Sequence, residues 1–540
     1  MRIKIFTLFF ALEFFTATTH AVTKYYFYVQ LANKNNTPYS LSVPSDYLSA
    51  RAIARRTAFN VAIDSTDLPV NATYVTQIAN KGVTIHCRSK WMNGVTILTS
   101  DSLIMSQVRA LPFVKWVKYT GKIDVAQPAA PRKSKREAEV FTYGTAATQT
   151  NQVNGSYLHN LGYTGKNIHV AVLDAGFTNV NVNPGFDSLR LQGRLLGTKD
   201  FSESTPNIYA SDSHGANVLS IMTGNLPNQY LGAAPHASYW LIRTEYAPTE
   251  YLSETDFWVS GIEFADSVGV DVVNSSLGYT TFDDPAMSFT YSNMNGVFSR
   301  ASRAATLAAQ KGIIVCNSAG NDGNKTWHYI GVPADAAGIV TVGAAESSGI
   351  PSAFTSYGPS ADSRQKPDLS AMGTATAYIN TSGALWSGNG TSYSSPLMAG
   401  MLSCFLQYAK TNFTNFSIES ILNSVKRSAN FYLQPTDRLG YGIPNFQTAC
   451  AFLPAMVEEL QMPNEDVRIF QNEANKLLIV NVLSDNETQI TLHNLSGKLV
   501  YSTTSTNRQI VFTTSGLSAG VYVLKLSGDK IQKAVKLILK

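Results

Sequence analysis

The sequence has few cysteines and few charges for its length. Four cysteines among 540 residues are too few for the disulfide-dense scaffold of a small secreted domain, and their spacings match no zinc-binding pattern. Only 15% of the residues are charged, and the formal net charge of +5 does not gather into a basic patch interleaved with aromatic residues. These absences argue against a nucleic-acid partner. Because 44% of the residues are hydrophobic, we expect core packing to stabilise the chain. Cys316 lies in an apolar run and is predicted to be a buried thiol, whereas a disulfide between Cys404 and Cys450 stays open.

After its first residues the sequence also lacks a long hydrophobic run. Residues 5–17 are mostly apolar but contain Glu13, and Thr-His-Ala follows, ending at Ala21 in a small-residue cleavage pattern. This pattern predicts a secretory signal peptide over residues 1–21. The alternative, a membrane anchor, needs about 20 apolar residues, so we expect no stable membrane span.

The length predicts more than one domain, because one hydrophobic core rarely serves more than about 250–300 residues. Residues 22–125 combine short β-like runs, near 25–31, 83–87 and 94–98, with helix-like runs, and are predicted to form a small α+β domain. Residues 126–140 are rich in Pro, Ala, Lys and Arg and include Pro-Arg-Lys-Ser-Lys-Arg. Such a run predicts an exposed linker, either a simple connection or a processing site.

The rest of the chain divides into two parts with different periodicity. Residues 141–455 alternate continuous apolar runs with helix-length segments, which indicates a parallel sheet covered by helices on both faces. The active site of such a sheet lies at the carboxyl ends of its strands. Residues 465–540 contain short β-like runs at close, regular spacing from residue 477 onward, which predicts a small antiparallel β-sandwich.

Three motifs carry the residue types of nucleophilic catalysis. The motif Val-Ala-Val-Leu-Asp-Ala-Gly ends an apolar strand in Asp174, and Asp-Ser-His-Gly places His214 at the start of an apolar helix. Gly-Asn-Gly-Thr-Ser is a glycine-rich turn that delivers Ser392 to the start of another helix. A serine hydroxyl is a poor nucleophile at neutral pH, so a histidine must take its proton and an aspartate must orient that histidine.

The order Asp, His, Ser and the local context of each motif closely resemble subtilisin-like serine proteases. The resemblance covers residues 151–451 and includes Val-Asn-Ser-Ser-Leu-Gly at 273–278 and Asn-Ser-Ala-Gly-Asn-Asp-Gly at 317–323. It implies a subtilisin-like three-layer α/β domain with a parallel central sheet. It also implies a secreted serine endopeptidase, made as a zymogen, that hydrolyses peptide bonds in proteins through an acyl-enzyme intermediate.

The same resemblance implies the roles of further residues. Asp174, His214 and Ser392 would be the catalytic triad, and Asn321 would stabilise the oxyanion together with the backbone N–H of Ser392. The pocket for the substrate residue before the scissile bond would be lined by Ser276, Leu277, Gly278, Ser318, Ala319 and Gly320. No cofactor is expected for catalysis and no residue is assigned to a metal. Structural Ca²⁺, which some relatives hold, stays open because the sequence shows no dedicated ligand loop.

The flanking domains resemble known partners of such proteases. Tyr-Leu-Ser-Ala-Arg-Ala-Ile-Ala-Arg-Arg at 47–56 is similar to propeptides, which assist folding and block the active site until they are cleaved. Gly-Leu-Ser-Ala-Gly-Val-Tyr-Val-Leu-Lys-Leu at 516–526 and the final Lys-Leu-Ile-Leu-Lys resemble the C-terminal sorting domain of the type IX secretion system of Bacteroidetes. The implied partners are protein or peptide substrates, the chain's own propeptide and that secretion machinery. The implied destination is the cell surface or the medium, reached through the periplasm.

Two departures from the family pattern concern the site. Ala175 follows Asp174 where Ser or Thr is usual, and Tyr393 follows Ser392 where Met is usual. The alternative function is a catalytically inactive subtilase-fold binding or adhesion protein. An inactive relative would typically have lost a triad residue, and an adhesin would show solvent-facing aromatic residues near the C-terminus. After residue 470 the large rings are Tyr501, Phe512 and Tyr522 alone.

Overall fold

The computed structural model describes residues 23–123, 142–203, 207–453, 457–460, 466–472, 476–483, 486–529 and 531–539. The predicted signal peptide (1–21) and the predicted linker (126–140) lie outside these ranges. Within them, the structure contains no helix whose length and hydrophobicity would let it cross a membrane.

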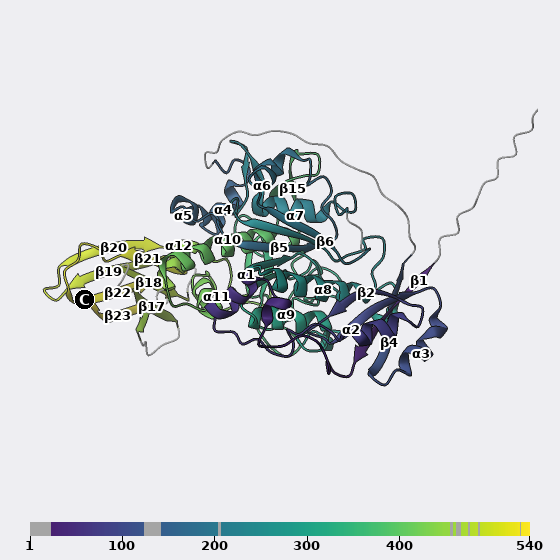
Figure 1. Ribbon diagram of the computed structural model, residues 1–540. Helices are drawn as coiled ribbons and strands as arrows, with labels where there is room; N and C mark the ends of the chain where they lie inside the picture. Colours follow the sequence, from purple (N-terminus) through teal and green to yellow (C-terminus); the bar gives the residue numbers. More distant parts are fainter. Residues whose placement is uncertain are drawn as a thin grey trace, which may run out of the picture.

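A seven-stranded sheet forms the centre of the middle domain (Figure 1). Its strand order is β13-β12-β11-β10-β5-β9-β6, and neighbouring strands pair in parallel, as the alternation of apolar runs and helices predicts. The strands are β5 (His169–Asp174), β6 (Leu195–Asp200), β9 (Ser238–Arg243), β10 (Val272–Ser275), β11 (Ile314–Ser318), β12 (Val340–Ala345) and β13 (Leu369–Met372).

Alternate residues of these strands enter two separate cores, which gives the domain three layers. In β5, Val170 and Val172 pack in one core, whereas Ala171 and Leu173 pack in the other. The first core includes α7 (His214–Thr223) and α10 (Thr391–Asn412), and the second includes α8 (Ser253–Val268) and α9 (Arg300–Gln310). Both faces of the parallel sheet are thus buried, which explains why its strands read as continuous apolar runs.

Shorter elements complete the middle domain. The helices are α4 (Ala147–Gln152), α5 (Gly155–Asn160), α6 (Asp187–Leu191), α11 (Ile418–Arg427) and α12 (Phe446–Phe452). The short strands pair as β7 (Asn225–Leu226) with β8 (Tyr230–Leu231) and β14 (Thr376–Ile379) with β15 (Leu385–Gly388). The 3-10 helices are η3 (Pro184–Phe186), η4 (Pro285–Met287) and η5 (Tyr291–Asn293).

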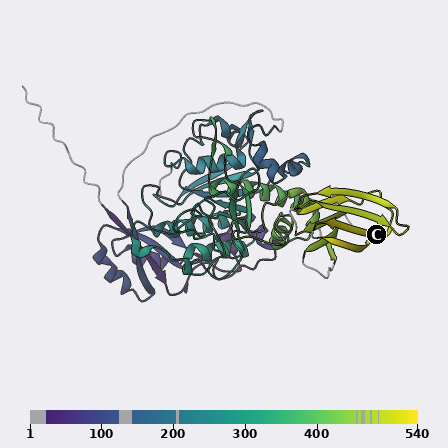
Figure 2. The ribbon, with the colours of Figure 1, turned by 180° about the vertical axis from the view of Figure 1, so that it is seen from behind.

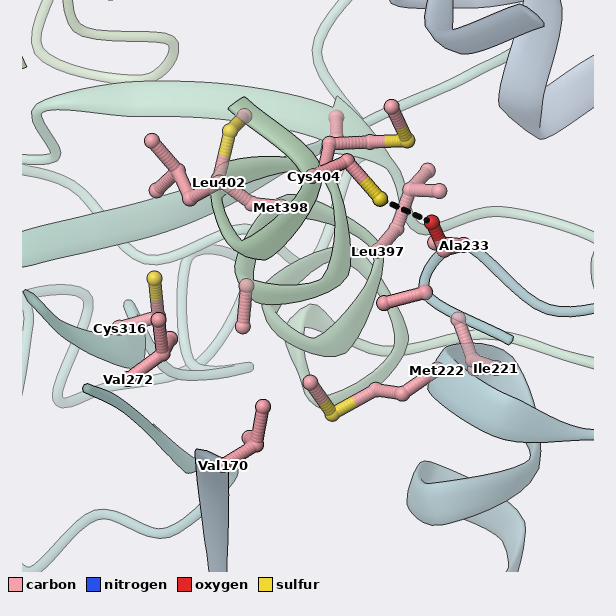
Figure 3. Packing of buried hydrophobic residues seen from close by; sticks show 14 of the residues in the cluster. Val170, Ile221, Met222, Ala233, Val272, Cys316, Leu397, Met398, Leu402 and Cys404 are labelled. Carbon is pink, nitrogen blue, oxygen red and sulfur yellow. Dashed lines mark hydrogen bonds between the residues drawn. The ribbon is translucent and has the colours of Figure 1, made fainter. Parts of the chain in front are cut away.

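Helix α10 runs through the larger core, where Figure 3 shows Cys404 beside Ala233, with Met398, Leu402 and the strand residue Cys316 among the packed side chains. The thiol of Cys404 donates a hydrogen bond to the Ala233 carbonyl oxygen at 3.2 Å. All four cysteines are buried and unpaired, so Cys404 and Cys450 form no disulfide. Cys316 is the buried thiol that its apolar run predicts.

The N-terminal domain is a four-stranded antiparallel sheet of order β2-β3-β1-β4 with a core of its own. Its elements are β1 (Lys24–Leu31), η1 (Pro44–Asp46), α1 (Ala50–Ala58), α2 (Ala72–Ala79), β2 (Thr84–Ser89), β3 (Gly94–Thr99), η2 (Ser102–Ile104), α3 (Met105–Arg109) and β4 (Val114–Ile123). The domain docks on α8, where buried Asp266 pairs with Arg55 at 2.5 Å and with Arg56 at 2.8 Å. Charges buried in this way need their partners, so these pairs fix how the two domains meet.

The C-terminal domain is a sandwich of two four-stranded antiparallel sheets. One sheet consists of β16 (Val457–Leu460), β17 (Val467–Asn472), β18 (Leu477–Val482) and β21 (Gln509–Thr513), and the other of β20 (Leu499–Ser505), β19 (Thr488–Asn494), β22 (Gly520–Gly528) and β23 (Gln532–Leu539). Strand β16 lies before residue 465, where the sequence places the start of this domain. The N-terminal domain and the sandwich lie at opposite ends of the middle domain (Figures 1 and 2).

Candidate active site

Three elements of the middle domain bring the motif residues together. Asp174 is the last residue of β5, His214 is the first residue of α7, and Ser392 lies in the first turn of α10. The loop after β5 approaches α7 so closely that a Cβ atom on Gly215 would lie 2.8 Å from Cβ of Asp174. Glycine after the histidine is therefore required for this approach.

Asp174 and His214 form a direct hydrogen bond. His214 Nδ1 lies 2.7 Å from Asp174 Oδ1, which also accepts a bond from the Ala175 N–H at 2.8 Å. The carboxylate is fully buried, and its Oδ2 atom finds no hydrogen-bond partner within the described ranges. Ala175 lacks the hydroxyl that Ser or Thr would bring to this position. The carboxylate is thus oriented through a single oxygen, which is the one that contacts the imidazole.

Opposing effects determine the pKa of His214. Burial by itself lowers the pKa, but the negative charge of Asp174, its hydrogen bond and the charge of Asp212 outweigh burial, and the net shift is upward. Asp212 also accepts a bond from the His214 backbone N–H at 2.7 Å. The surroundings therefore stabilise the imidazolium form, which is the form that arises when this histidine takes a proton.

The hydroxyl of Ser392 faces the cleft. Its Oγ donates to the Ser276 carbonyl oxygen at 3.3 Å, while the Ser276 hydroxyl donates to the Ser392 carbonyl oxygen at 3.0 Å. The neighbouring serines are buried, and each has a hydrogen-bond acceptor. Ser394 donates to the Thr391 carbonyl and Ser395 to Asn274. Ser392 is thus the serine of this helix start that lines the cleft.

Asn321 lies in the same cleft with a fixed amide orientation. Its Oδ1 accepts from the backbone N–H of Thr391 at 2.8 Å and from the Thr391 hydroxyl at 3.0 Å. Because a backbone N–H can only donate, this contact identifies the oxygen of the amide. The Nδ2 donors remain for the cleft beside Ser392.

The cleft has a volume of about 390 Å³ and brings the predicted site residues together. His214, Asn321 and Ser392 all line it. So do the six predicted pocket residues, which are Ser276, Leu277, Gly278, Ser318, Ala319 and Gly320.

Three glutamates in this cleft were not predicted from the sequence. Glu245, Glu250 and Glu254 also line it, and one carboxylate oxygen of each lies within 4.8 Å of those of the other two. Such a group could hold a cation. The sequence does place all three in the short segment after β9, and β9 pairs with β5, the strand that ends in Asp174. This spacing could have indicated a cluster near the site.

Comparison with known proteins identifies the family. The model of the subtilase family matches residues 165–442, just over half of the chain. The chain belongs to the subtilase family. A peptidase S8 propeptide domain of Bacteroidota matches residues 26–138, which include most of the predicted linker, and a secretion system C-terminal sorting domain matches residues 468–540.

Individual known proteins are also similar to this chain. Subtilisin NAT of Bacillus subtilis subsp. natto is 26% identical over 375 residues, which is 69% of this chain and 84% of that protein. The subtilisin of Bacillus pumilus is 28% identical over 301 residues, which is 55% of this chain and 96% of that protein. Among solved structures, the MycP3 protease from the type VII (ESX-3) secretion system matches with a TM-score of 0.44 at 20% identity, covering 57% of this chain and 88% of that one.

The matches to the family models and to the subtilisins confirm the main functional predictions. This subtilase is a serine-type endopeptidase made as a zymogen, with its own propeptide domain. Its sorting domain directs it to the cell surface or the medium. The inactive alternative finds no support in them.

Proposed function

We propose that Asp174, His214 and Ser392 form the catalytic triad of this endopeptidase and that Asn321 stabilises the oxyanion. The observation that carries the assignment is the 2.7 Å hydrogen bond between His214 and buried Asp174, with Ser392 and Asn321 in the same cleft. The Ser392 hydroxyl bonds the Ser276 carbonyl, and it turns to His214 when a peptide enters. Hydrogen bonds of this kind are often long before substrate binds.

The reaction proceeds in two halves. Ser392 Oγ attacks the carbonyl carbon of the scissile bond and its proton passes to His214 Nε2, while the carbonyl oxygen becomes an oxyanion. The intermediate then expels the amine, which takes the proton from His214 and leaves an ester on Ser392. Water attacks this ester by the same route and releases the acid. Each step uses the chain's own groups and water, so we propose that catalysis needs no cofactor.

Two segments are proposed to bind the substrate. Ser276, Leu277 and Gly278 follow β10. Ser318 is the last residue of the neighbouring strand β11, and Ala319 and Gly320 follow it. Both segments line the cleft, which supports a pocket between them for the residue before the scissile bond. A peptide would pair with their backbone as an added strand.

Asn321 provides the first test of this function. The Asn321→Leu variant should lose roughly 100- to 1,000-fold in kcat, the loss known for an oxyanion asparagine in subtilisin, with little change in KM. The amide donates a hydrogen bond to the oxyanion, which forms only during the reaction. Its loss therefore destabilises the transition state more than the bound substrate. Steady-state kinetics on one peptide would measure both constants. A rise in KM with an unchanged kcat would contradict the assignment.

The N-terminal domain is proposed to assist folding and to inhibit the enzyme until it is removed. Its contacts with the catalytic domain support this role. In addition to the pairs of Asp266, buried Glu263 of α8 accepts bonds from the Ser89 hydroxyl at 2.6 Å and from the backbone N–H groups of Lys90 and Trp91. While it is attached, the N-terminal domain thus supplies ion-pair and hydrogen-bond partners to the buried carboxylates of α8.

The C-terminal sandwich is proposed to act in export and not in catalysis. It has its own core, formed by both of its sheets, and it lies across the molecule from the propeptide domain. Deleting residues 465–540 should therefore leave peptide hydrolysis intact and hold the protein in the periplasm of its native host. Fractionated cells expressing the full-length and truncated proteins would be assayed for activity. Truncated enzyme outside the cells at full-length levels would contradict the export role.

A further inference from the structure

The cleft has an acidic wall that the triad does not explain. Glu245 lies just after β9, Glu250 in the loop that follows, and Glu254 in the first turn of α8. Glu245 is 7% exposed and Glu254 is 2% exposed, whereas Glu250 is partly exposed. Three carboxyl groups within 4.8 Å of one another repel strongly when they are ionised.

One oxygen of this group lacks a partner. Glu254 Oε1 accepts from the Tyr246 N–H at 2.8 Å, but its buried Oε2 has no hydrogen-bond partner among the residues that the structure describes. Glu245 accepts from the hydroxyl of Tyr279 and, at 3.3 Å, from that of Thr244. A buried, unpartnered carboxylate oxygen beside two further carboxyl groups is a costly arrangement unless a cation completes it.

Within the described part of the chain, two charged neighbours of this group, Asp283 and Lys325, do not supply that cation. The Asp283 carboxylate accepts from the Glu250 backbone N–H at 3.2 Å and adds to the negative charge. Lys325, which also lines the cleft, pairs instead with Asp322 at 2.9 Å. Burial and then the neighbouring Asp283 raise the pKa of Glu250 to about 7. Burial and the neighbouring carboxylates also hold the pKa values of Glu245 and Glu254 well above their usual range.

The propeptide domain ends beside this wall. A Cβ atom on Gly121 in β4 would lie 2.6 Å from Cβ of Tyr251 and 2.9 Å from the Ser253 hydroxyl, so the end of β4 contacts the segment between Glu250 and Glu254. Beyond β4 the sequence continues to Pro-Arg-Lys-Ser-Lys-Arg at 131–136. In the sequence this basic run begins eight residues after Ile123, the last residue of β4.

We propose that Glu245, Glu250 and Glu254 form a subsite for the ammonium or guanidinium group of a substrate lysine or arginine. The enzyme is then selective for basic segments, and its own residues 131–136 are one such segment. A basic side chain fits better than a bound metal ion because the wall opens into the cleft that receives the peptide, and because the sequence carries a complementary basic run between the propeptide domain and the catalytic domain. This inference rests on the proposed function and adds its substrate class.

Paired peptides test the subsite. Mature enzyme would be assayed on quenched fluorescent peptides that differ at one position, within four residues of the scissile bond, in carrying arginine or its neutral analogue citrulline. At one position kcat/KM should favour arginine by about 30-fold or more, the range expected when a buried charge finds its partner. Glu254→Gln and Glu250→Gln should each lower this ratio about tenfold. The matched control is Glu419→Gln, an exposed glutamate on α11, which should leave the ratio unchanged.

Three results would overturn the subsite. They are equal kcat/KM values for arginine and citrulline at every position, a preference that survives both glutamine variants, and calorimetric binding of Ca²⁺ alone that Glu254→Gln abolishes. The last would assign the wall to a metal. Because Glu250 is partly exposed, its variant should fold even if Glu254→Gln does not. If hydrolysis depends on Ser392 but shows no preference for a basic residue, only the subsite is contradicted. If no hydrolysis depends on Ser392, the proposed function is contradicted.

Discussion

The Ser392→Ala protein should hydrolyse peptides about 10⁶-fold more slowly than the wild type, the loss known for the nucleophile of subtilisin. Without the hydroxyl no acyl-enzyme can form, and the oxyanion donors retain only a small residual rate. The same protein, made without another protease, should keep its propeptide, because we expect the enzyme to cut its own chain within residues 126–140. Kinetic assays and N-terminal sequencing measure the two effects.

The matched control for this variant is Ser394→Ala. The Ser394 hydroxyl is buried in the same helix and donates to the Thr391 carbonyl, away from the cleft. Its loss should leave kcat within about tenfold of the wild-type value, because one neutral hydrogen bond usually contributes no more than that. Normal processing of the Ser392→Ala protein would show that self-cleavage is not required for maturation.

The Asp174→Asn protein should lose about 10⁴-fold in kcat. The Asp174 carboxylate accepts a bond from His214 Nδ1, whereas an amide can donate to that atom and hold the imidazole in the wrong tautomer. The same change removes the charge that raises the pKa of His214. Activity needs the neutral imidazole and rises as pH increases through that pKa, so the acidic limb of the kcat/KM profile should move to lower pH.

Asp212→Asn is the control that removes one charge near the same histidine. Its side-chain oxygen can still accept the bond from the His214 backbone N–H. It should shift the acidic limb in the same direction but keep kcat within about tenfold, because the tautomer is unaffected. Equal losses of kcat in the two variants would mean that charge alone, and not orientation, explains the role of Asp174.

Local sequence patterns predict most of the catalytic fold. The apolar runs that end in Asp174 and precede Ser276 are strands of a parallel sheet, and such a sheet brings their carboxyl ends to one edge. The resemblance of their motifs to the subtilisin family identifies His214 and Ser392, and the close approach of Asp174 explains why glycine follows the histidine.

Other features depend on contacts that no local pattern records. The three glutamates of the acidic wall come together because the loop after β9 folds beside the cleft. In the sequence, each of them resembles an ordinary solvent-exposed charge. Strand β17 contains Arg468 and ends in Gln-Asn, and it is defined by its pairing with β16 and β18. Cys404 is unpaired, and its thiol contacts the Ala233 carbonyl oxygen, a residue far from it in the sequence.

Covalent labelling would identify the nucleophilic serine directly. A fluorophosphonate reacts with a serine hydroxyl that a neighbouring histidine activates, and mass spectrometry of the digested protein locates the adduct. We expect one adduct per mature enzyme, on Ser392, and none in the Ser392→Ala or heat-denatured protein. Labelling of another serine, or labelling that persists unchanged in Ser392→Ala, would contradict this assignment.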